Sequence, residues 1–142
     1  MTDFDLERTY LFIDGQGGLA AEDVGPDFWA RIGANPNAGG TMISASEGRG
    51  DWARWEMHPA GAEVLVILDG APVVWLEHLE GRLERVAARA GSTVVVPMGA
   101  WHRCECDQPY KILYITYGKG TTHRPVTEED RSRGAAWLRA QG

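Results

Sequence analysis

Two histidines and two glutamates are the side chains in this sequence best suited to chemistry. Glu56 and His58 are separated by one residue, and four residues lie between His58 and Glu63. His102 lies much further along the chain. Imidazole nitrogens and carboxylate oxygens are ligands of divalent transition ions. The four side chains therefore predict a site for one such ion, and Mn, Fe, Ni, Co and Zn are all compatible with these ligand types.

The role of Glu56 has several interpretations. As a fourth ligand it gives a site of two histidines and two carboxylates. If it stays off the ion, the other three residues form a two-histidine, one-carboxylate triad with open positions, and Glu56 is a candidate general base. In a site without metal, a glutamate facing an apolar interior needs a cationic partner, for which Arg54 and Arg103 are the nearby candidates.

Strand-length runs of β-branched and aromatic residues surround the four side chains. We predict strands over residues 41–46, 51–58, 63–68, 72–78, 82–88, 93–96, 101–106 and 110–117. Gly, Pro and Asp residues separate these runs, and the Asp69-Gly70 pair is a strong signal for a hairpin turn. Many short strands joined by tight turns are typical of a β-sandwich or barrel.

The alternation of faces along a strand predicts which side chains meet. Residues two apart point the same way, so Glu56 and His58 share one face of their strand. Glu63 shares a face with Leu65 and Ile67, which identifies that face as the interior of the barrel. His102 must then come from a strand that closes against the first two.

Both ends of the chain are predicted to add elements to the barrel. Before it, we expect a strand over residues 8–13, an irregular segment over 20–26 and one helical turn over 27–32, capped by Asp27. The apolar side chains of that turn are expected to pack inward, namely Phe28, Trp29 and Ile32. After the barrel, Thr127 followed three residues later by Asp130 predicts a capped helix. Its apolar contacts are expected to be Trp137 and Leu138.

Length and charge narrow the classes of function. With 142 residues we predict one domain over 1–142, with a barrel core over about 41–118, an N-terminal strand and loop over 1–40, and a C-terminal tail and helix over 119–142. The net charge is −6, and we see no basic face, which argues against nucleic acid as a partner. No apolar run approaches the ~18 residues of a membrane span.

The cysteines and the first residues bear on the compartment. The first residues are acidic and mixed, unlike the basic patch and apolar block of a signal peptide, so we expect a cytoplasmic protein. Cys104 and Cys106 are too few and too close to form a disulfide framework, and we expect reduced thiols.

The order and spacing of these residues resemble the two motifs of the cupin superfamily over roughly residues 50–118. In that pattern, the first motif has two histidines around one residue, then a glutamate and a glycine. The second motif has a glycine, a proline, a glycine and a third histidine. His58, Glu63 and His102 match the second histidine, the glutamate and the third histidine. Glu56 stands at the position of the first histidine, which is a departure from the family.

The resemblance implies an all-β cupin double-stranded β-helix, a barrel related to the jelly roll, here with a short C-terminal helix. It also implies a homodimer and a small-molecule ligand or substrate. Two classes of function remain open. One is a metal-dependent enzyme of the oxygenase or the isomerase/lyase type. The other is a non-catalytic cupin that binds or senses a small molecule, with or without metal.

Three further side chains lie near or outside the motifs. Cys106 comes four positions after His102 and is expected to face the interior, more as small apolar filling than as a thiol beside the metal. His78 and His123 lie outside both motifs, and we expect them at the surface or behind the ligands.

Overall fold

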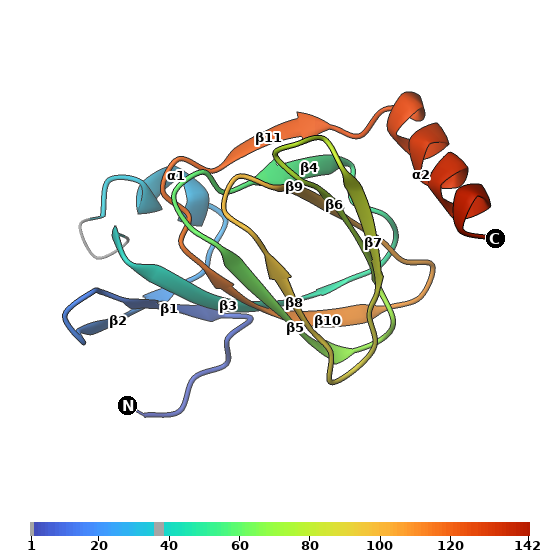
Figure 1. Cartoon of the computed structure of the whole chain (residues 1–142). Helices are drawn as coiled ribbons and strands as arrows, with labels where there is room; N and C mark the ends of the chain where they lie inside the picture. The colour runs from blue at the N-terminus through green and yellow to red at the C-terminus, as the bar shows by residue number, and fades with distance from the viewer. Residues whose placement is uncertain (1, 36–38) are drawn as a thin grey trace.

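The computed structural model describes residues 2–35 and 39–142. Within these ranges, two antiparallel sheets of six and five strands face each other and form a barrel (Figure 1). The larger sheet has the order β2 (Leu19–Asp23), β1 (Thr9–Ile13), β3 (Thr41–Gly48), β10 (Tyr110–Thr116), β5 (Glu63–Asp69) and β8 (Thr93–Val96). The smaller sheet has the order β11 (Thr122–Pro125), β4 (Arg54–Met57), β9 (Trp101–Glu105), β6 (Val73–Glu77) and β7 (Leu83–Ala87).

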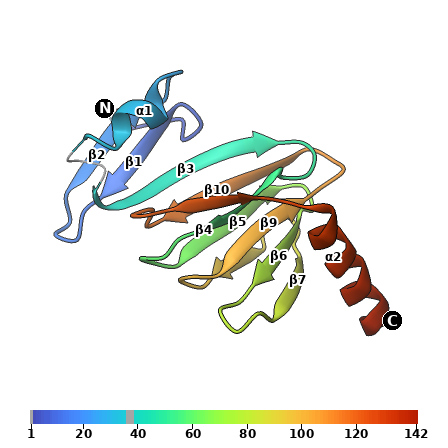
Figure 2. The same ribbon diagram turned by 90° about the horizontal axis from the view of Figure 1, so that it is seen from above.

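Two helices lie outside this barrel. The single turn α1 (Phe28–Ile32) lies beside the β1–β2 hairpin, and α2 (Glu128–Gln141) lies at the opposite side of the molecule (Figure 2). The predicted all-β barrel with a short C-terminal helix is therefore confirmed. No helix in residues 2–35 or 39–142 is long and apolar enough to span a membrane.

The alternation of side chains along β5 shows why these strands form a barrel. Glu63, Leu65 and Ile67 are buried, whereas Val64 and Val66 between them are half-buried. Burial at every second residue is the pattern of a strand with one face against a core. The interior core consists of Leu65, Ile67, Val74, Leu76, Ala88, Val94, Val96, Ala100, Cys104, Cys106, Tyr110 and Ile112.

The N-terminal segment differs from the sequence-based expectation. The predicted irregular segment 20–26 is mostly strand, because β2 pairs antiparallel with β1 over its whole length. The turn between them is set by Asp14, whose Oδ1 accepts hydrogen bonds from the backbone N–H groups of Gln16 and Gly18. A tight turn fixes the register of a hairpin, so this polar segment pairs despite its weak strand propensity.

The helical turn α1 is confirmed, but two of its predicted details are wrong. The side chain of Asp27 makes no capping hydrogen bond, and Trp29 is 67% exposed. Phe28 attaches α1 to the hairpin. It is fully buried, and its ring lies edge-on to Tyr10 at a centroid distance of 5.1 Å. A single turn can bury only one side of its circumference, and here that side is centred on Phe28.

Helix α2 begins with the predicted capping arrangement. Thr127 Oγ1 accepts from the backbone N–H of Asp130, and the Asp130 carboxylate accepts from the backbone N–H of Thr127. The same carboxylate accepts a hydrogen bond from Trp55 Nε1 at 3.0 Å, which ties the helix to β4. Trp137 packs edge-on against Trp75, but Leu138 is 46% exposed and not the predicted apolar contact.

Candidate metal centre

The strand register brings two of the predicted residues, Glu56 and His102, and one further side chain, His123, to the same place. On β4, Glu56 pairs with His102 of β9 on one side and with His123 of β11 on the other. Directly paired residues of neighbouring antiparallel strands point to the same face of the sheet. His58 follows β4 immediately, and Glu63 begins β5 in the larger sheet. The cluster thus lies between the two sheets.

The four predicted residues lie close together, but within the described residues only Glu56, His58 and His102 form a group with one ligand atom each within 4.8 Å of one another, and Glu63 is not part of that group. Glu63 contacts both imidazoles, with Oε1 3.0 Å from His102 Nε2 and Oε2 3.3 Å from His58 Nε2. Glu56 Oε1 lies 3.4 Å from His58 Nε2. The spacing of the three ligand atoms from Glu56, His58 and His102 is compatible with one shared ion.

Burial distinguishes Glu56 from the other three residues. The side chains of His102, His58 and Glu63 are 0%, 2% and 4% exposed, whereas that of Glu56 is 27% exposed. The cluster therefore has three buried members and one member that contacts solvent. Solvent reaches the site from the side of Glu56.

A threonine outside both motifs holds the ring of His58. His58 Nδ1 lies 2.7 Å from Thr121 Oγ1, and the Thr121 hydroxyl donates its proton to the carbonyl of Gly118 at 2.9 Å. A hydroxyl has one proton, so towards His58 the Thr121 oxygen acts as an acceptor. His58 then carries its proton on Nδ1, and Nε2 presents a lone pair to the cluster. This is the tautomer that a metal ligand needs.

A second threonine orients the carboxylate of Glu63. The hydroxyl of Thr116 on β10 donates to Glu63 Oε2 at 2.5 Å, and both side chains are buried. The bond engages one carboxylate oxygen and restricts rotation of the group. Oxygen Oε1 remains directed at the His102 side of the cluster.

Several buried polar atoms of the cluster lack hydrogen bonds. Such atoms indicate whether the site suits an ion, because a bound ion would give them a partner. Within the described residues, His58 Nε2, Glu63 Oε1 and both ring nitrogens of His102 make none. The 3.0 Å contact between His102 Nε2 and Glu63 Oε1 is close, but its angles are not those of a hydrogen bond. Buried polar atoms without partners are costly, and a cation beside His58 Nε2, Glu63 Oε1 and His102 Nε2 would satisfy those three, whereas His102 Nδ1 points away from them. The donor set fits a divalent transition ion.

Electrostatics within the cluster favour the charged form of Glu63. Burial by itself raises the pKa of its carboxyl, but the close contacts with His102 and His58 outweigh burial and lower the pKa from 4.5 to about 2. For His58, burial lowers the pKa, but Glu63 and then Glu56 outweigh it and raise the pKa above 6.5. Glu63 is therefore an ionised carboxylate at neutral pH, as ligation requires.

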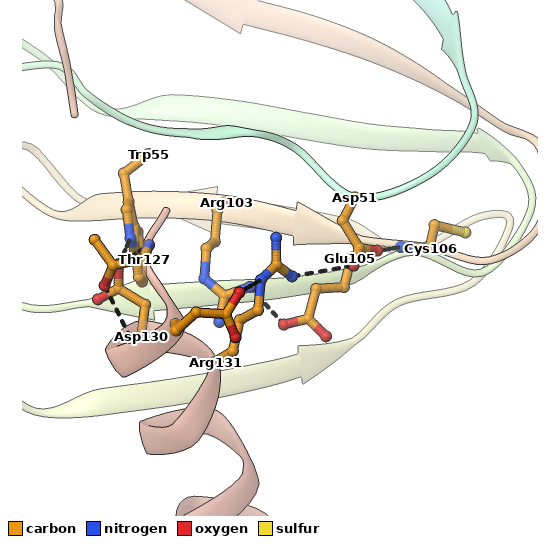
Figure 3. Close-up of polar contacts among 9 residues, drawn as sticks. Asp51, Trp55, Arg103, Glu105, Cys106, Thr127, Asp130 and Arg131 are labelled. Atoms are coloured by element: carbon orange, nitrogen blue, oxygen red, sulfur yellow. Dashed lines mark hydrogen bonds and ion pairs between the residues drawn. The ribbon is translucent and has the colours of Figure 1, made fainter. Parts of the chain in front are cut away.

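The predicted cationic partners of Glu56 lie elsewhere. Arg54 is exposed, and Arg103 points to the outer face of the smaller sheet, towards α2 (Figure 3). There Arg103 pairs with Glu105, and its guanidinium lies 5.0 Å from the ring centre of Trp55. Strand parity explains this, because Arg103 is adjacent to His102 and must face the other way. Glu56 instead has His58 and His123 as neighbours, with His123 Nε2 4.0 Å from Glu56 Oε1.

Comparisons with known proteins bear on the fold. No family model and no curated protein sequence matches the chain. Among solved structures, a mutant of Bacillus subtilis oxalate decarboxylase is 18% identical over 61% of this chain and 24% of that chain, with a TM-score of 0.52. Hydroquinone 1,2-dioxygenase from Sphingomonas sp. TTNP3 is 23% identical over 54% of this chain, with a TM-score of 0.48. A cupin-2 domain protein from Shewanella frigidimarina is 20% identical over 54% of this chain, with a TM-score of 0.43.

These likenesses concern architecture. The chain has the cupin fold. It spans 59% of the length of the dioxygenase chain and 24% of the decarboxylase chain. At identities below 25%, the comparisons show the fold alone and do not identify the substrate or the reaction of this chain.

The remaining predicted side chains of the cupin are placed as follows. Cys106 is buried in the interior core as expected, and its thiol donates to the carbonyl of Gln108 at 3.0 Å. Cys104 is also buried, and burial raises the pKa of its thiol, which favours apolar filling over reactivity. His78 pairs with Glu84 at 2.8 Å, away from the four ligands.

Thr116, Thr121 and His123 were not identified from the sequence as parts of the site. Thr116 was accessible to parity reasoning, since it shares a face of β10 with Tyr110 and Ile112. Thr121 lies in the connection to β11, and the sequence analysis did not predict that strand. Without β11 there was no reason to place His123 opposite Glu56.

Two cavities lie away from the cluster. One of about 490 Å³ lies beside Tyr110 and is lined by Glu47, Gly48, Arg49, Asp69, Pro109 and Lys111. The other, of about 280 Å³, lies between α2 and the outer face of the smaller sheet, beside Trp75 and Gly134. Neither of these two cavities includes a residue of the cluster.

Proposed function

We propose that this chain is a metal-binding cupin in which Glu56, His58, Glu63 and His102 hold one divalent transition ion. The observation that carries the proposal is the convergence of buried imidazole and carboxylate atoms that lack hydrogen bonds. The tautomer imposed by Thr121 supports it, because the lone pair of His58 Nε2 then points at the cluster. Two carboxylates among four ligands favour Mn and Fe over Ni, Co and Zn.

We propose that the site is that of a metal-dependent enzyme acting on a small organic molecule, of the oxygenase or the isomerase/lyase type. A bound divalent ion supplies Lewis-acid polarisation of an oxygen donor. The chain itself supplies a dry, rigid wall, since three of the four ligands are buried. Glu56, with its carboxylate at the solvent side, is placed to hold or accept a proton of a molecule at the opening.

The alternative is a cupin that binds or senses a small molecule without turnover. The apolar core of the barrel supports it, because neither of the two described cavities is lined by a residue of the cluster. The two functions differ in one observable. An enzyme loaded with its metal converts a co-purified ligand during incubation, whereas a sensor releases that ligand unchanged, as mass spectrometry would detect.

The metal content of the purified protein tests the proposed ligands. We expect close to one equivalent of transition metal in the wild type, and loss of it in His58→Ala and in His102→Ala. His78→Ala is the matched control, because this histidine pairs with Glu84 outside the cluster. A wild type that takes up no metal, and whose Tm does not change with chelator, would contradict the proposal.

Glu56→Gln distinguishes a ligand from a base. As a ligand, Glu56 contributes charge to the ion, so the amide variant should bind metal at least ten times more weakly in a chelator competition. If metal affinity is unchanged and only turnover is lost, Glu56 is a base and not a ligand. Glu56→His restores the residue of the family motif and should raise affinity above that of Glu56→Gln.

We further propose that the chain forms a homodimer through the outer face of the larger sheet. The strand register aligns one row of apolar side chains across this face: Leu11, Ile43, Ile115, Val64 and Val95. We call this row the outer band. Val95 is 57% exposed, and Leu68 and Leu19 on the same face are 45% and 59% exposed.

A second copy of the chain is the occupant that suits the outer band. The band crosses five strands, or roughly 19 Å at about 4.8 Å between strands, and all five of its side chains are apolar. Two sheets pack face to face when both surfaces are of that kind, and an identical surface meets the requirement on both sides of a two-fold axis. Strand β1 contributes Leu11 to this face, whereas Trp137 packs against Trp75 of its own chain.

A further inference from the structure

The opening of the metal centre is bounded by two side chains. Glu56 is 27% exposed and His123 is 39% exposed, whereas His58, Glu63 and His102 are all below 5%. On the inner side, the cluster abuts the apolar core, and Trp52 packs edge-on against His102 at 5.8 Å. A molecule that approaches the site from solvent therefore meets Glu56 and His123 first.

His123 is held at this opening by its own strand. It pairs with Glu56 in the β11–β4 register, so its ring points to the same face as the cluster. The next residue, Arg124, points to the opposite face, where its guanidinium stacks over Trp101 at 4.4 Å and binds Glu77 at 3.0 Å. These contacts anchor β11 against the smaller sheet and fix the direction of the His123 side chain.

The gap between the two side chains suits one bridging oxygen. His123 Nε2 and Glu56 Oε1 are 4.0 Å apart, too far for a direct hydrogen bond. A hydroxyl oxygen can lie about 2.8 Å from each atom at once, accepting from the imidazole and donating to the carboxylate. The pair therefore offers one donor and one acceptor to the same hydroxyl group.

We propose that His123 is a ligand-contacting residue of this cupin, and that with Glu56 it recognises the hydroxyl group of a hydroxylated organic molecule at the opening. The inference rests on the proposed metal function, because it places that molecule beside the ion. It adds a residue from outside both cupin motifs and a chemical class of ligand. It does not require His123 to bind the ion itself.

Phenol and anisole are the probes that test the inference, because they differ only by a methyl group on the oxygen. Their binding to the cobalt-loaded protein is followed by the visible spectrum of Co(II) and by calorimetry. In the wild type we expect phenol to bind about tenfold more tightly than anisole, the value of one net hydrogen bond of about 1.4 kcal/mol. In His123→Ala the ratio should fall to within twofold. His123→Gln, whose amide can still donate, should retain part of the preference, and His78→Ala should retain all of it.

Each other result contradicts the inference. A phenol preference that is equal in the wild type and His123→Ala, or absent from the wild type, excludes hydroxyl recognition by His123. Loss of cobalt in His123→Ala would make this histidine a metal ligand, which is a different role. A wild type that takes up no cobalt overturns the proposed function itself, and the cobalt stoichiometry separates that failure from the others.

Discussion

At the scale of single residues, the proposed ligands depend on neighbouring hydroxyl groups for their orientation. His58 points its lone pair at the cluster because Thr121 Oγ1 accepts a hydrogen bond from Nδ1–H. Glu63 keeps one oxygen towards His102 because Thr116 occupies the other. Groups of this kind commonly change metal affinity by one to two orders of magnitude. The strength of the site is therefore expected to depend on the hydroxyls of Thr116 and Thr121.

Thr121→Val removes a hydroxyl and keeps the shape of the side chain. His58 then loses the acceptor that fixes its tautomer, so metal affinity should fall about tenfold or more in a chelator competition. Thr122→Val is the matched control, because Thr122 is exposed and its strand neighbours place it on the opposite face from His123. Equal metal affinities for the two variants would show that Thr121 does not orient the ligand.

The ionisation of Glu63 predicts how the metal-free protein responds to acid. Its pKa is about 2 in the folded chain against 4.5 for an ordinary glutamate, so folding favours the ionised form. This contribution to stability is fully present above about pH 4.5 and is lost as the pH falls towards 2. In urea unfolding with chelator present, the stability difference between wild type and Glu63→Gln should shrink from pH 6 to pH 3. A difference that stays constant would contradict the lowered pKa.

At the scale of elements, the outer face of the smaller sheet explains how α2 and β11 are attached. Arginines and tryptophans alternate across it, with Arg124 and Arg103 on either side of Trp55 at 5.1 and 5.0 Å from its ring centre. Trp55 also donates to Asp130 at the start of α2. The strand that carries His123 and the C-terminal helix thus share one set of contacts. Loosening one should affect the other.

Thr127→Ala tests the start of α2. The substitution removes the hydroxyl that accepts from the Asp130 N–H, and loss of such a cap typically costs about 1 kcal/mol. We expect a lower free energy of unfolding and a change in tryptophan fluorescence, since Asp130 also binds Trp55. Ser132→Ala, an exposed position in the same helix, should leave both nearly unchanged. Equal stabilities would show that the capping box does not hold the helix.

At the scale of the whole molecule, the larger sheet carries a row of apolar side chains, the outer band, on its outer face. An antiparallel sheet of a monomer commonly keeps its outer face polar, and the outer band departs from that pattern. Exposed contiguous apolar surface often marks an interaction site. The proposed ligands lie between the two sheets, so pairing through the outer band would not cover them.

Val95→Glu places a charge in the outer band at a residue that is 57% exposed, so the fold should tolerate it. We expect the wild type to elute as a dimer and Val95→Glu as a monomer in size-exclusion chromatography with light scattering. Leu79→Glu is the control, because Leu79 is 82% exposed but lies in the turn between β6 and β7. A monomeric wild type, or a dimeric Val95→Glu, would contradict the proposed interface.

The strands of the barrel and the four-residue cluster could be predicted from the sequence more completely than the ends of the chain. Residues 63–68 and 110–117 were recognisable because they are strand-length runs rich in β-branched and aromatic residues, bounded by turn residues. The segments of β2 and β11 have no such pattern. Each exists through pairing with a neighbour, β2 with β1 and β11 with β4. Pairing energy between distant segments leaves little trace in local composition.

By itself, the sequence determined the donor types, their order and the face on which they lie. Glu56, His58, Glu63 and His102 follow from residue chemistry and strand parity, both of which are local. Only the tertiary structure decided which atoms meet, which nitrogen of His58 is protonated, and that Glu56 faces His123 and not Arg103. These depend on strand register and on hydrogen bonds between segments more than 60 residues apart, such as His58 and Thr121. No local pattern encodes such contacts, because they form only when the whole barrel closes.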